Sequence, residues 1–313
     1  MKIAEDELRF DGRVAIVTGA GRGIGRAYAT LLAARGSKVV VNDLGGTRAG
    51  VDGDPGVAES VAAAIRDAGG EAVADGSDIA TADGAAALVD TAVASWGRVD
   101  VLVNNAGIYL PDAFPDIEPA EFRRYFDVHV GGSFAVTRRC WPHMVRAGYG
   151  RVVMTTSHGM LGSAALTSYG AAKGAVFALA RALAMAGGTA GILVNSVAPV
   201  AATRMTGATD DAPGGRFGVD SSAPSLVAPL VALLCHESCA VTGETFLAGG
   251  RRQARLYLAE TPGYVHPGVD LTPEDVAAHW AEVLDTDGAM VPTDTLSWLD
   301  MNAARLVTTP VGE

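Results

Sequence analysis

Tyr169 and Lys173 stand four residues apart in an alanine-rich segment, residues 168–180, that is typical of a helix. On a helix, residues at i and i+4 share one face, with their Cβ atoms about 5–6 Å apart. A lysine ammonium this close favours the phenolate, so the spacing predicts that Lys173 lowers the pKa of Tyr169 from its ordinary value of about 10. Such a tyrosine can serve as general acid or base between a ketone and an alcohol. Because the same spacing also arises by chance on helix surfaces, the pair needs support from elsewhere in the chain.

A glycine-rich turn near the N-terminus supplies that support. Residues 13–18 form a short apolar run typical of a buried parallel strand, and a helical pattern follows from residue 24. In this context the backbone amides of the turn and the N-terminus of the helix can bind the pyrophosphate of a dinucleotide. The sequence therefore predicts a nucleotide site whose first contacts are Gly19, Arg22, Gly23, Ile24 and Gly25.

Asp43 ends a second predicted strand, residues 38–43, and stands 18 residues after Gly25. A carboxylate at this place can accept hydrogen bonds from the adenosine ribose hydroxyls and would repel a 2′-phosphate. We therefore predict NAD rather than NADP as the cofactor, although a strand-end aspartate can also be merely solvated. A third predicted strand, residues 72–78, ends in another acid, and we expect Asp78 and Ile79 to lie near the adenine.

Strands and helices alternate regularly through the first 104 residues, with helices expected at 59–68 and 84–96 and a strand at 99–104. This alternation predicts a Rossmann-type α/β fold with a doubly wound parallel sheet. We expect residues 1–250 to form one dinucleotide-binding and catalytic domain, with a last strand at 242–247. Residues 251–313 are expected to form a C-terminal helical extension that packs on this domain or on a neighbouring subunit. A helix start is predicted at residues 272–275, and no element at 290–313.

A third motif, residues 104–107 (Asn-Asn-Ala-Gly), joins the glycine turn and the Tyr-x-x-x-Lys pair. With these three motifs in order, the chain resembles the short-chain dehydrogenase/reductase family. Residues 39–46, 128–134 and 234–239 are similar to the branch of (3R)-hydroxyacyl-CoA dehydrogenases found in peroxisomal multifunctional enzymes, from about residue 8 to about residue 285. The resemblance implies that Tyr169 exchanges a proton with the substrate oxygen and that Lys173 binds the nicotinamide ribose. It adds four cofactor contacts: Asn105, Ala106, Gly107 and Pro199.

The resemblance also implies a hydroxyl that holds the substrate carbonyl, and two residues compete for this role. Counting forward from Gly150 selects Ser157, whereas counting back from Tyr169 selects Thr156. Successive strand side chains point to opposite faces, so only one of them can serve. We favour Ser157 because a loop accommodates a deletion more readily than a strand. His129 stands where many family members have a proton-relay asparagine, so a relay role and a structural role both stay open.

Composition narrows the possible partners and the compartment. The 313 residues are 49% apolar and carry a formal net charge of −11, which argues against nucleic acid or an anionic membrane surface as a partner. The three cysteines lack metal-ligand spacing and cannot all pair, so we expect no metal site and a cytoplasmic location. The N-terminus has no signal-peptide pattern, and no apolar run is long enough to span a membrane.

These features together predict an NAD-dependent oxidoreductase that interconverts a small-molecule secondary alcohol and a ketone. The first substrate expectation is a 3-hydroxyacyl-CoA, following the resemblance. However, residues 108–112 lack the basic side chains of that branch, so a hydrophobic free ketone, such as a steroid or polycyclic compound, is the alternative. A catalytically inactive nucleotide-binding regulator is the alternative of another class. The segment 201–218 is expected to form a lid over the substrate, and family habit implies a homodimer or homotetramer.

Overall fold

The computed structural model describes residues 7–112, 114–201 and 223–308. The chain divides into two compact units, the first ending at Arg255 and the second beginning at Leu256. The predicted lid at residues 201–218 falls, apart from Ala201, outside the described residues.

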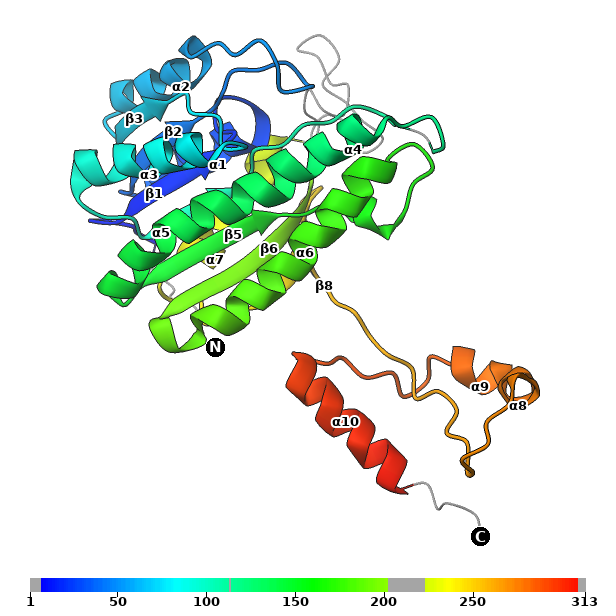
Figure 1. Ribbon diagram of the computed structural model, residues 1–313. Helices are drawn as coiled ribbons and strands as arrows, with labels where there is room; N and C mark the ends of the chain where they lie inside the picture. Colours follow the sequence, from blue (N-terminus) through cyan, green and yellow to red (C-terminus); the bar gives the residue numbers. More distant parts are fainter. Residues whose placement is uncertain (1–6, 113, 202–222, 309–313) are drawn as a thin grey trace. The chain divides into compact units, whose positions relative to one another are not determined.

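The first unit is organised around a single sheet (Figure 1). The strand order is β3-β2-β1-β4-β5-β6-β7-β8, and each neighbouring pair from β3 to β7 is parallel. The order reverses between β1 and β4, which is the place where doubly wound sheets bind ligands. The predicted fold class is therefore confirmed. The strands are β1 (Val14–Thr18), β2 (Lys38–Asn42), β3 (Glu71–Asp75), β4 (Val101–Asn104), β5 (Gly150–Thr155), β6 (Ile192–Val200), β7 (Thr245–Gly249) and β8 (Arg252–Leu256).

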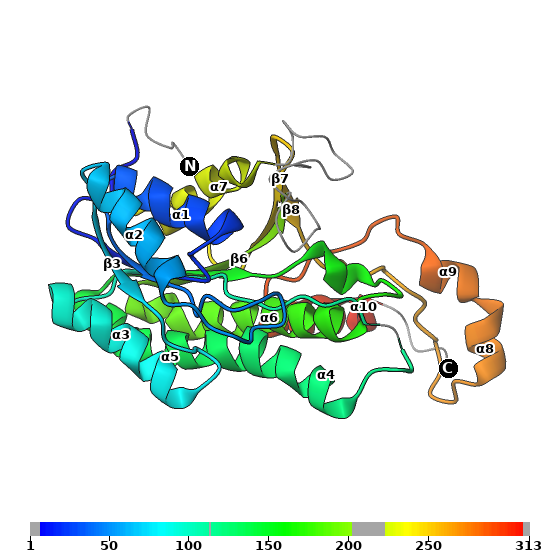
Figure 2. The ribbon, with the colours of Figure 1, turned by 90° about the horizontal axis from the view of Figure 1, so that it is seen from above.

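Helices cover both faces of this sheet (Figure 2). Successive strand side chains alternate between the faces, so Val17 packs in the core beneath α1 and α2, whereas its neighbour Ile16 packs against the helices on the opposite face. One face carries α1 (Gly23–Ala34), α2 (Gly56–Asp67) and α7 (Ala228–Cys235); the other carries α3 (Ala82–Trp96), α5 (Ser133–Ala147) and α6 (Thr167–Gly187). A short helix, α4 (Pro119–Phe126), continues through a π-helical turn, η1 (Asp127–Gly132), into α5.

Two expectations for the last third of the chain are corrected. The strand predicted at 242–247 is β7, but it is not the last one, because β8 follows it across a turn in which Arg251 has a φ of 64°. The segment for which no element was predicted contains the helix α10 (Thr295–Thr308). At the start of α10, Ser297 N donates to Asp294 Oδ1 at 2.8 Å and Asp294 N donates to Ser297 Oγ at 3.1 Å, so Asp294 is the N-cap that could have indicated this helix.

The second unit contains α8 (Pro273–Ala278), α9 (Trp280–Leu284) and α10. The predicted start of α8 is confirmed: Asp275 N donates to the Thr272 hydroxyl at 3.2 Å, and Thr272 N donates to the Asp275 carboxylate at 3.0 Å. This reciprocal pair satisfies two backbone donors that the helix itself leaves free. The packing of the extension, on the first unit or on a neighbouring subunit, stays a prediction. Within the described ranges, no helix has both the length and the apolar character needed to cross a bilayer.

Candidate active site

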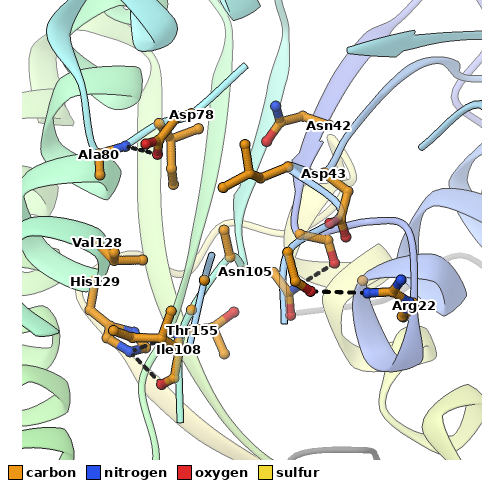
Figure 3. A pocket seen from close by; sticks show the side chains of 18 of the residues that line it. Arg22, Asn42, Asp43, Asp78, Ala80, Asn105, Ile108, Val128, His129 and Thr155 are labelled. Atoms are coloured by element: carbon orange, nitrogen blue, oxygen red, sulfur yellow. Dashed lines mark hydrogen bonds between the residues drawn. The ribbon is translucent and has the colours of Figure 1, made fainter. Parts of the chain in front are cut away.

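A cavity of about 400 Å³ opens at the carboxyl ends of the central strands of the first unit (Figure 3). It lies at the switch point between β1 and β4, as expected for a ligand site in this fold. The structure brings all the sequence-predicted cofactor residues to its walls: Gly19, Arg22, Gly23, Ile24, Gly25, Asp43, Asp78, Ile79, Asn105, Ala106, Gly107, Tyr169, Lys173 and Pro199. His129 also lines the cavity, whereas Ser157 and Thr156 do not.

The glycine turn between β1 and α1 is held closed by the Asn-Asn-Ala-Gly segment. Asn105 Nδ2 donates to the carbonyl oxygens of Thr18 and Gly19, both at 3.0 Å, and the Thr18 hydroxyl accepts the amides of Asn105 and Ala106 at 3.0 Å. A Cβ atom on Gly25 would collide with the Gly19 carbonyl oxygen. The side chain of Asn105, predicted as a cofactor contact, is thus used to brace the turn, and only glycine permits this close approach of backbone to backbone.

Asp43 lies at the end of β2, and both of its carboxylate oxygens are bonded to backbone amides. Oδ2 accepts the Gly21 amide at 2.8 Å, and Oδ1 accepts the Gly45 amide at 2.7 Å. Each oxygen retains a further lone pair that could accept a ribose hydroxyl. Arg22 points its guanidinium to the carbonyl oxygen of Gly46 at 3.2 Å, in the loop that follows Asp43 (Figure 3).

Asp78 and Ile79 line the same cavity farther along the sheet edge. Asp78 Oδ1 accepts the Ala80 amide at 2.9 Å, which stabilises the turn that leads into α3 (Figure 3). Sequence analysis missed the contribution of the loop after β2 and of α4 to this wall. Arg124 on α4 donates to the carbonyl oxygen of Gly50 at 3.0 Å, so these two segments meet beside the cavity. No local pattern in the sequence predicts a contact between the loop after β2 and α4, because the two segments are far apart in the chain.

Tyr169 and Lys173 lie on consecutive turns of α6, and the Lys173 ammonium is 5.7 Å from the centre of the Tyr169 ring. Lys173 Nζ donates to the Thr155 carbonyl oxygen at 2.6 Å. Burial lowers the pKa of Lys173 to about 7. Burial also raises the pKa of Tyr169, and the nearby Ser157 hydroxyl offsets only part of this rise. The expectation that Lys173 lowers the pKa of Tyr169 is therefore wrong in this structure, because burial disfavours both charged forms.

The two candidate hydroxyls at the end of β5 point in different directions. The Ser157 hydroxyl accepts the Gly159 amide at 3.0 Å. Its oxygen and the Tyr169 ring both lie within 3.4 Å of the point that a Cβ atom on Gly159 would occupy, so the two side chains are close together. The Thr156 hydroxyl instead donates to the carbonyl oxygen of Lys173 at 2.7 Å, and this bond is buried. The geometry favours Ser157, because its hydroxyl is the one next to the phenol of Tyr169.

His129 lies in the π-helical turn η1 and is 1% exposed. Its Nε2 is 3.0 Å from the Ile108 carbonyl oxygen and 3.3 Å from the Ile108 amide (Figure 3). Burial, followed by the charge of Lys173, holds the pKa of His129 well below its ordinary value, so the ring is neutral. We assign the hydrogen to Nε2, which then donates it to the nearer Ile108 carbonyl oxygen. In this tautomer Nδ1 is a hydrogen-bond acceptor, and it is buried without a partner among the described residues.

The family model described as short chain dehydrogenase matches residues 13–213. The chain belongs to this family. It is thereby an oxidoreductase of the class that acts on CH–OH groups with a nicotinamide dinucleotide. The resemblance inferred from the three motifs is confirmed, and so is the similarity to the multifunctional-enzyme branch.

Two curated relatives and one solved structure place this short-chain dehydrogenase more closely. It is 41% identical over 294 residues to peroxisomal multifunctional enzyme type 2 of Drosophila melanogaster, covering 92% of this chain and 48% of that protein. It is 42% identical over 282 residues to a putative short-chain type dehydrogenase/reductase of Mycobacterium tuberculosis, covering 89% and 96%. A structure of 7α-hydroxysteroid dehydrogenase complexed with NADH and 7-oxo glycochenodeoxycholic acid matches with a TM-score of 0.71 and 31% identity, covering 80% and 97%. The chain thus spans about half the length of the first of these relatives.

The inner end of the cavity fits the ribose of such a dinucleotide. Lys173 Nζ bonds Thr155 and has two further N–H donors. The Thr155 hydroxyl and His129 Nδ1 are buried without partners among the described residues. A ribose, which offers hydroxyls as donors and acceptors, would satisfy such groups. Thr155 was not predicted, although strand alternation places it on the same face as Ser157 and could have identified it. In the described part of the chain, no cluster of three or more His, Cys, Asp or Glu side chains could hold a metal ion.

Proposed function

We propose that this protein is an NAD-dependent dehydrogenase/reductase that interconverts a secondary alcohol and a ketone, with a 3-hydroxyacyl-CoA thioester as its first substrate class. The observation that carries this proposal is the placement of Tyr169, with the buried Lys173 one turn further along α6, in the wall of a cavity that Asp43 also lines. The Ser157 hydroxyl lies close to the Tyr169 ring. The similarity to a multifunctional enzyme over 92% of this chain supports the substrate class.

The residues divide the chemistry among them. The cofactor supplies or accepts the hydride when it is bound. In ketone reduction the Ser157 hydroxyl donates a hydrogen bond to the substrate oxygen, and Tyr169 gives that oxygen its proton. The phenol of Tyr169 is protonated at neutral pH and so has the proton that this step needs, although burial, which raises its pKa, makes it a weaker acid than an exposed tyrosine. Lys173 and the unpartnered Thr155 hydroxyl would hold the ribose hydroxyls of the bound cofactor.

His129 is proposed first as a structural residue, because its Nε2 already binds the backbone of Ile108. Its unpartnered Nδ1 is the observation that favours a relay role in addition. The variant His129→Asn, which introduces the residue of many family members, distinguishes the structural role from the relay role. If kcat is kept, an amide suffices; if it falls while NADH affinity is unchanged, the imidazole itself moves a proton.

We propose NAD over NADP because the Asp43 carboxylate faces the part of the cavity where the adenosine ribose would lie. A 2′-phosphate there would meet a negative charge held rigidly by two backbone amides. Measuring the Kd of NADH and NADPH by quenching of protein fluorescence tests this, and Asp43→Ser should narrow the difference between them. Equal affinities in the wild type would overturn the assignment.

A hydrophobic free ketone is the second candidate substrate. The segment after the Asn-Asn-Ala-Gly motif places the ring of Tyr109 edge-on to Tyr169, with 5.3 Å between ring centres, and so gives the reacting phenol an aromatic neighbour. A similar structure holds a 7-oxo steroid conjugate. These two observations favour a flat, apolar ketone over a long acyl chain.

The deciding experiment follows NADH absorbance with the purified protein and acetoacetyl-CoA, longer 3-ketoacyl-CoA esters and a panel of cyclic ketones. The Tyr169→Phe variant runs beside it, with NADPH as the cofactor control. Turnover of thioesters that the variant lacks supports the first proposal, and turnover of free ketones alone supports the second. NADH binding without turnover of any substrate would instead favour the nucleotide-binding regulator.

We propose a homodimer or homotetramer as the working assembly, in keeping with the family. The cytoplasmic location stays a prediction from cysteine usage. The relative from Drosophila melanogaster is named as a peroxisomal enzyme, so the compartment needs its own localisation experiment.

A further inference from the structure

The segment that follows the Asn-Asn-Ala-Gly motif, residues 108–112, forms hydrogen bonds to other parts of the chain at nearly every position. The hydroxyl of Tyr125 binds both the amide and the carbonyl of Leu110, at 2.8 and 2.6 Å. The Tyr109 amide donates to the Arg48 carbonyl oxygen at 3.0 Å. Backbone bonds of this density hold the segment rigidly between β4 and α4.

The last residue of the segment, Asp112, reaches the start of α6. Its amide donates to the Ala165 carbonyl oxygen at 3.0 Å, and its carboxylate Oδ2 accepts the amide of Ser168 at 2.9 Å. Asp112 is 8% exposed, so this hydrogen bond is shielded from water. Ser168 is the residue directly before Tyr169.

Asp112 provides the N-terminal cap of α6, which no side chain at the start of that helix provides. The residue at the N-cap is Leu166, which has no side-chain hydrogen bond to the first turn. The first amides of a helix have no partner within the helix, and its N-terminus favours a negative charge. The carboxylate of Asp112 meets both needs from 56 positions earlier in the chain. Its other oxygen, Oδ1, is buried without a partner among the described residues, so this acid is not placed here for solubility.

We propose that Asp112 is a positioning residue for Tyr169. It fixes the first turn of α6 to the rigid segment 108–112, and Tyr109 of the same segment packs on the Tyr169 ring. The phenol oxygen is thereby held in place beside Ser157. The inference rests on the proposed role of Tyr169 as the proton donor.

Three variants test this inference: Asp112→Ala, Asp112→Asn and, as a matched control, Asp116→Ala, which removes an exposed acid a few residues away. In Asp112→Ala we expect kcat to fall about 10- to 100-fold, because a small misplacement of a catalytic group has an effect of this size. KM and the Kd of NADH should stay within about threefold. Asparagine should restore most of kcat, since its amide oxygen can still accept the Ser168 amide, and the control should match the wild type.

Two readouts separate positioning from a general loss of folding. The primary kinetic isotope effect with 4-deuterated NADH does not depend on the amount of active protein, and it should rise in Asp112→Ala as the chemical step becomes limiting. Hydrogen exchange of the amides at residues 167–171 should accelerate in that variant and not in Asp112→Asn. If the alanine variant does not fold, Asp112→Glu, which displaces the carboxylate by one methylene, replaces it with the same expectations.

The proposal is overturned if exchange at residues 167–171 is unchanged, if kcat is kept, or if the isotope effect stays at the wild-type value while kcat falls. It is also overturned if Asp112→Asn is as impaired as Asp112→Ala. A wild-type protein that turns over no ketone would reject the proposed function instead. The exchange experiment would then still decide whether Asp112 holds the first turn of α6.

Discussion

At the scale of single residues, burial decides how the catalytic groups are protonated. Tyr169 and Lys173 lie close together on α6, yet the pKa of the phenol is raised and that of the amine is lowered to about 7. The protein alone therefore keeps both groups closer to neutrality than their spacing suggests. A bound dinucleotide, with its negative phosphates, would favour the charged form of Lys173.

If Ser157 is the hydroxyl that binds the substrate oxygen, substitutions of Ser157 and of its neighbour Thr156 should have different effects. Ser157→Ala should lower kcat about 100- to 1,000-fold, the usual cost of losing a donor to a developing oxyanion. Thr156→Ala should leave kcat within about threefold and lower the free energy of unfolding by about 0.5–1.5 kcal/mol, because the hydrogen bond from the Thr156 hydroxyl to the Lys173 carbonyl oxygen is lost. Steady-state kinetics and urea unfolding of both variants give the answer. The reverse pattern would make Thr156 the catalytic hydroxyl.

Lys173→Met should stabilise the protein when no cofactor is bound. The pKa of Lys173 is lowered on folding from 10.5 to about 7, so between these values the unfolded chain binds more protons and stability rises with pH. At about 1.4 kcal/mol per pKa unit, the cost of burying the ammonium is several kcal/mol at pH 7 or below and vanishes above pH 10.5. Urea unfolding should therefore show a larger gain for the variant at pH 6.5 than at pH 9.5. A gain independent of pH would show that burial of charge is not its cause.

At the scale of elements, the β1–α1 turn is the part that tolerates least change. Gly25→Ala would drive a methyl group into the Gly19 carbonyl oxygen and crowd Asn105 Nδ2, so the turn must open. We expect NADH affinity to fall at least about tenfold and stability to fall by about 1–3 kcal/mol, as for other overpacked sites. Gly188→Ala is the matched control, because an added Cβ there meets no atom within 4 Å. Titration of NADH fluorescence compares the two, and an unchanged Kd in Gly25→Ala would contradict the role given to the turn.

At the scale of the whole molecule, the residues described as lining the cofactor cavity all come from the first unit. Each described residue that lines it precedes position 200, and the second unit begins at Leu256. A chain shortened by residues 257–313 should therefore bind NADH with a Kd within about threefold of the full chain. Loss of binding would show that the extension contributes to the cavity. Sedimentation of both chains tests the predicted packing: a lower oligomeric mass of the shortened chain would place the extension on a neighbouring subunit.

Local patterns in the sequence were sufficient for the fold class of the first unit and for the location of its cavity, although they did not reveal the strand β8. Buried parallel strands appear in the sequence as short apolar runs. The glycine turn and Asp43 each follow directly after such a strand, and Tyr169 and Lys173 are related by the spacing of one helical turn. All of these patterns involve residues that are close together in the sequence. These features were predictable because the physics that selects them acts over a few residues. The extension was less predictable. A capping box with proline after its N-cap revealed α8, whereas the comparable reciprocal pair of Asp294 and Ser297 at the start of α10 was overlooked.

Only the tertiary structure decided how the groups act on one another. The Ser157 hydroxyl lies near the Tyr169 ring, whereas the Thr156 hydroxyl donates to the Lys173 carbonyl oxygen, because the two side chains leave the end of β5 in different directions. Asp112 caps α6 across 56 positions of the chain, and burial reverses the pKa shift expected for Tyr169. Burial and long-range hydrogen bonds depend on which distant segments meet when the sheet assembles, and no local pattern contains that information.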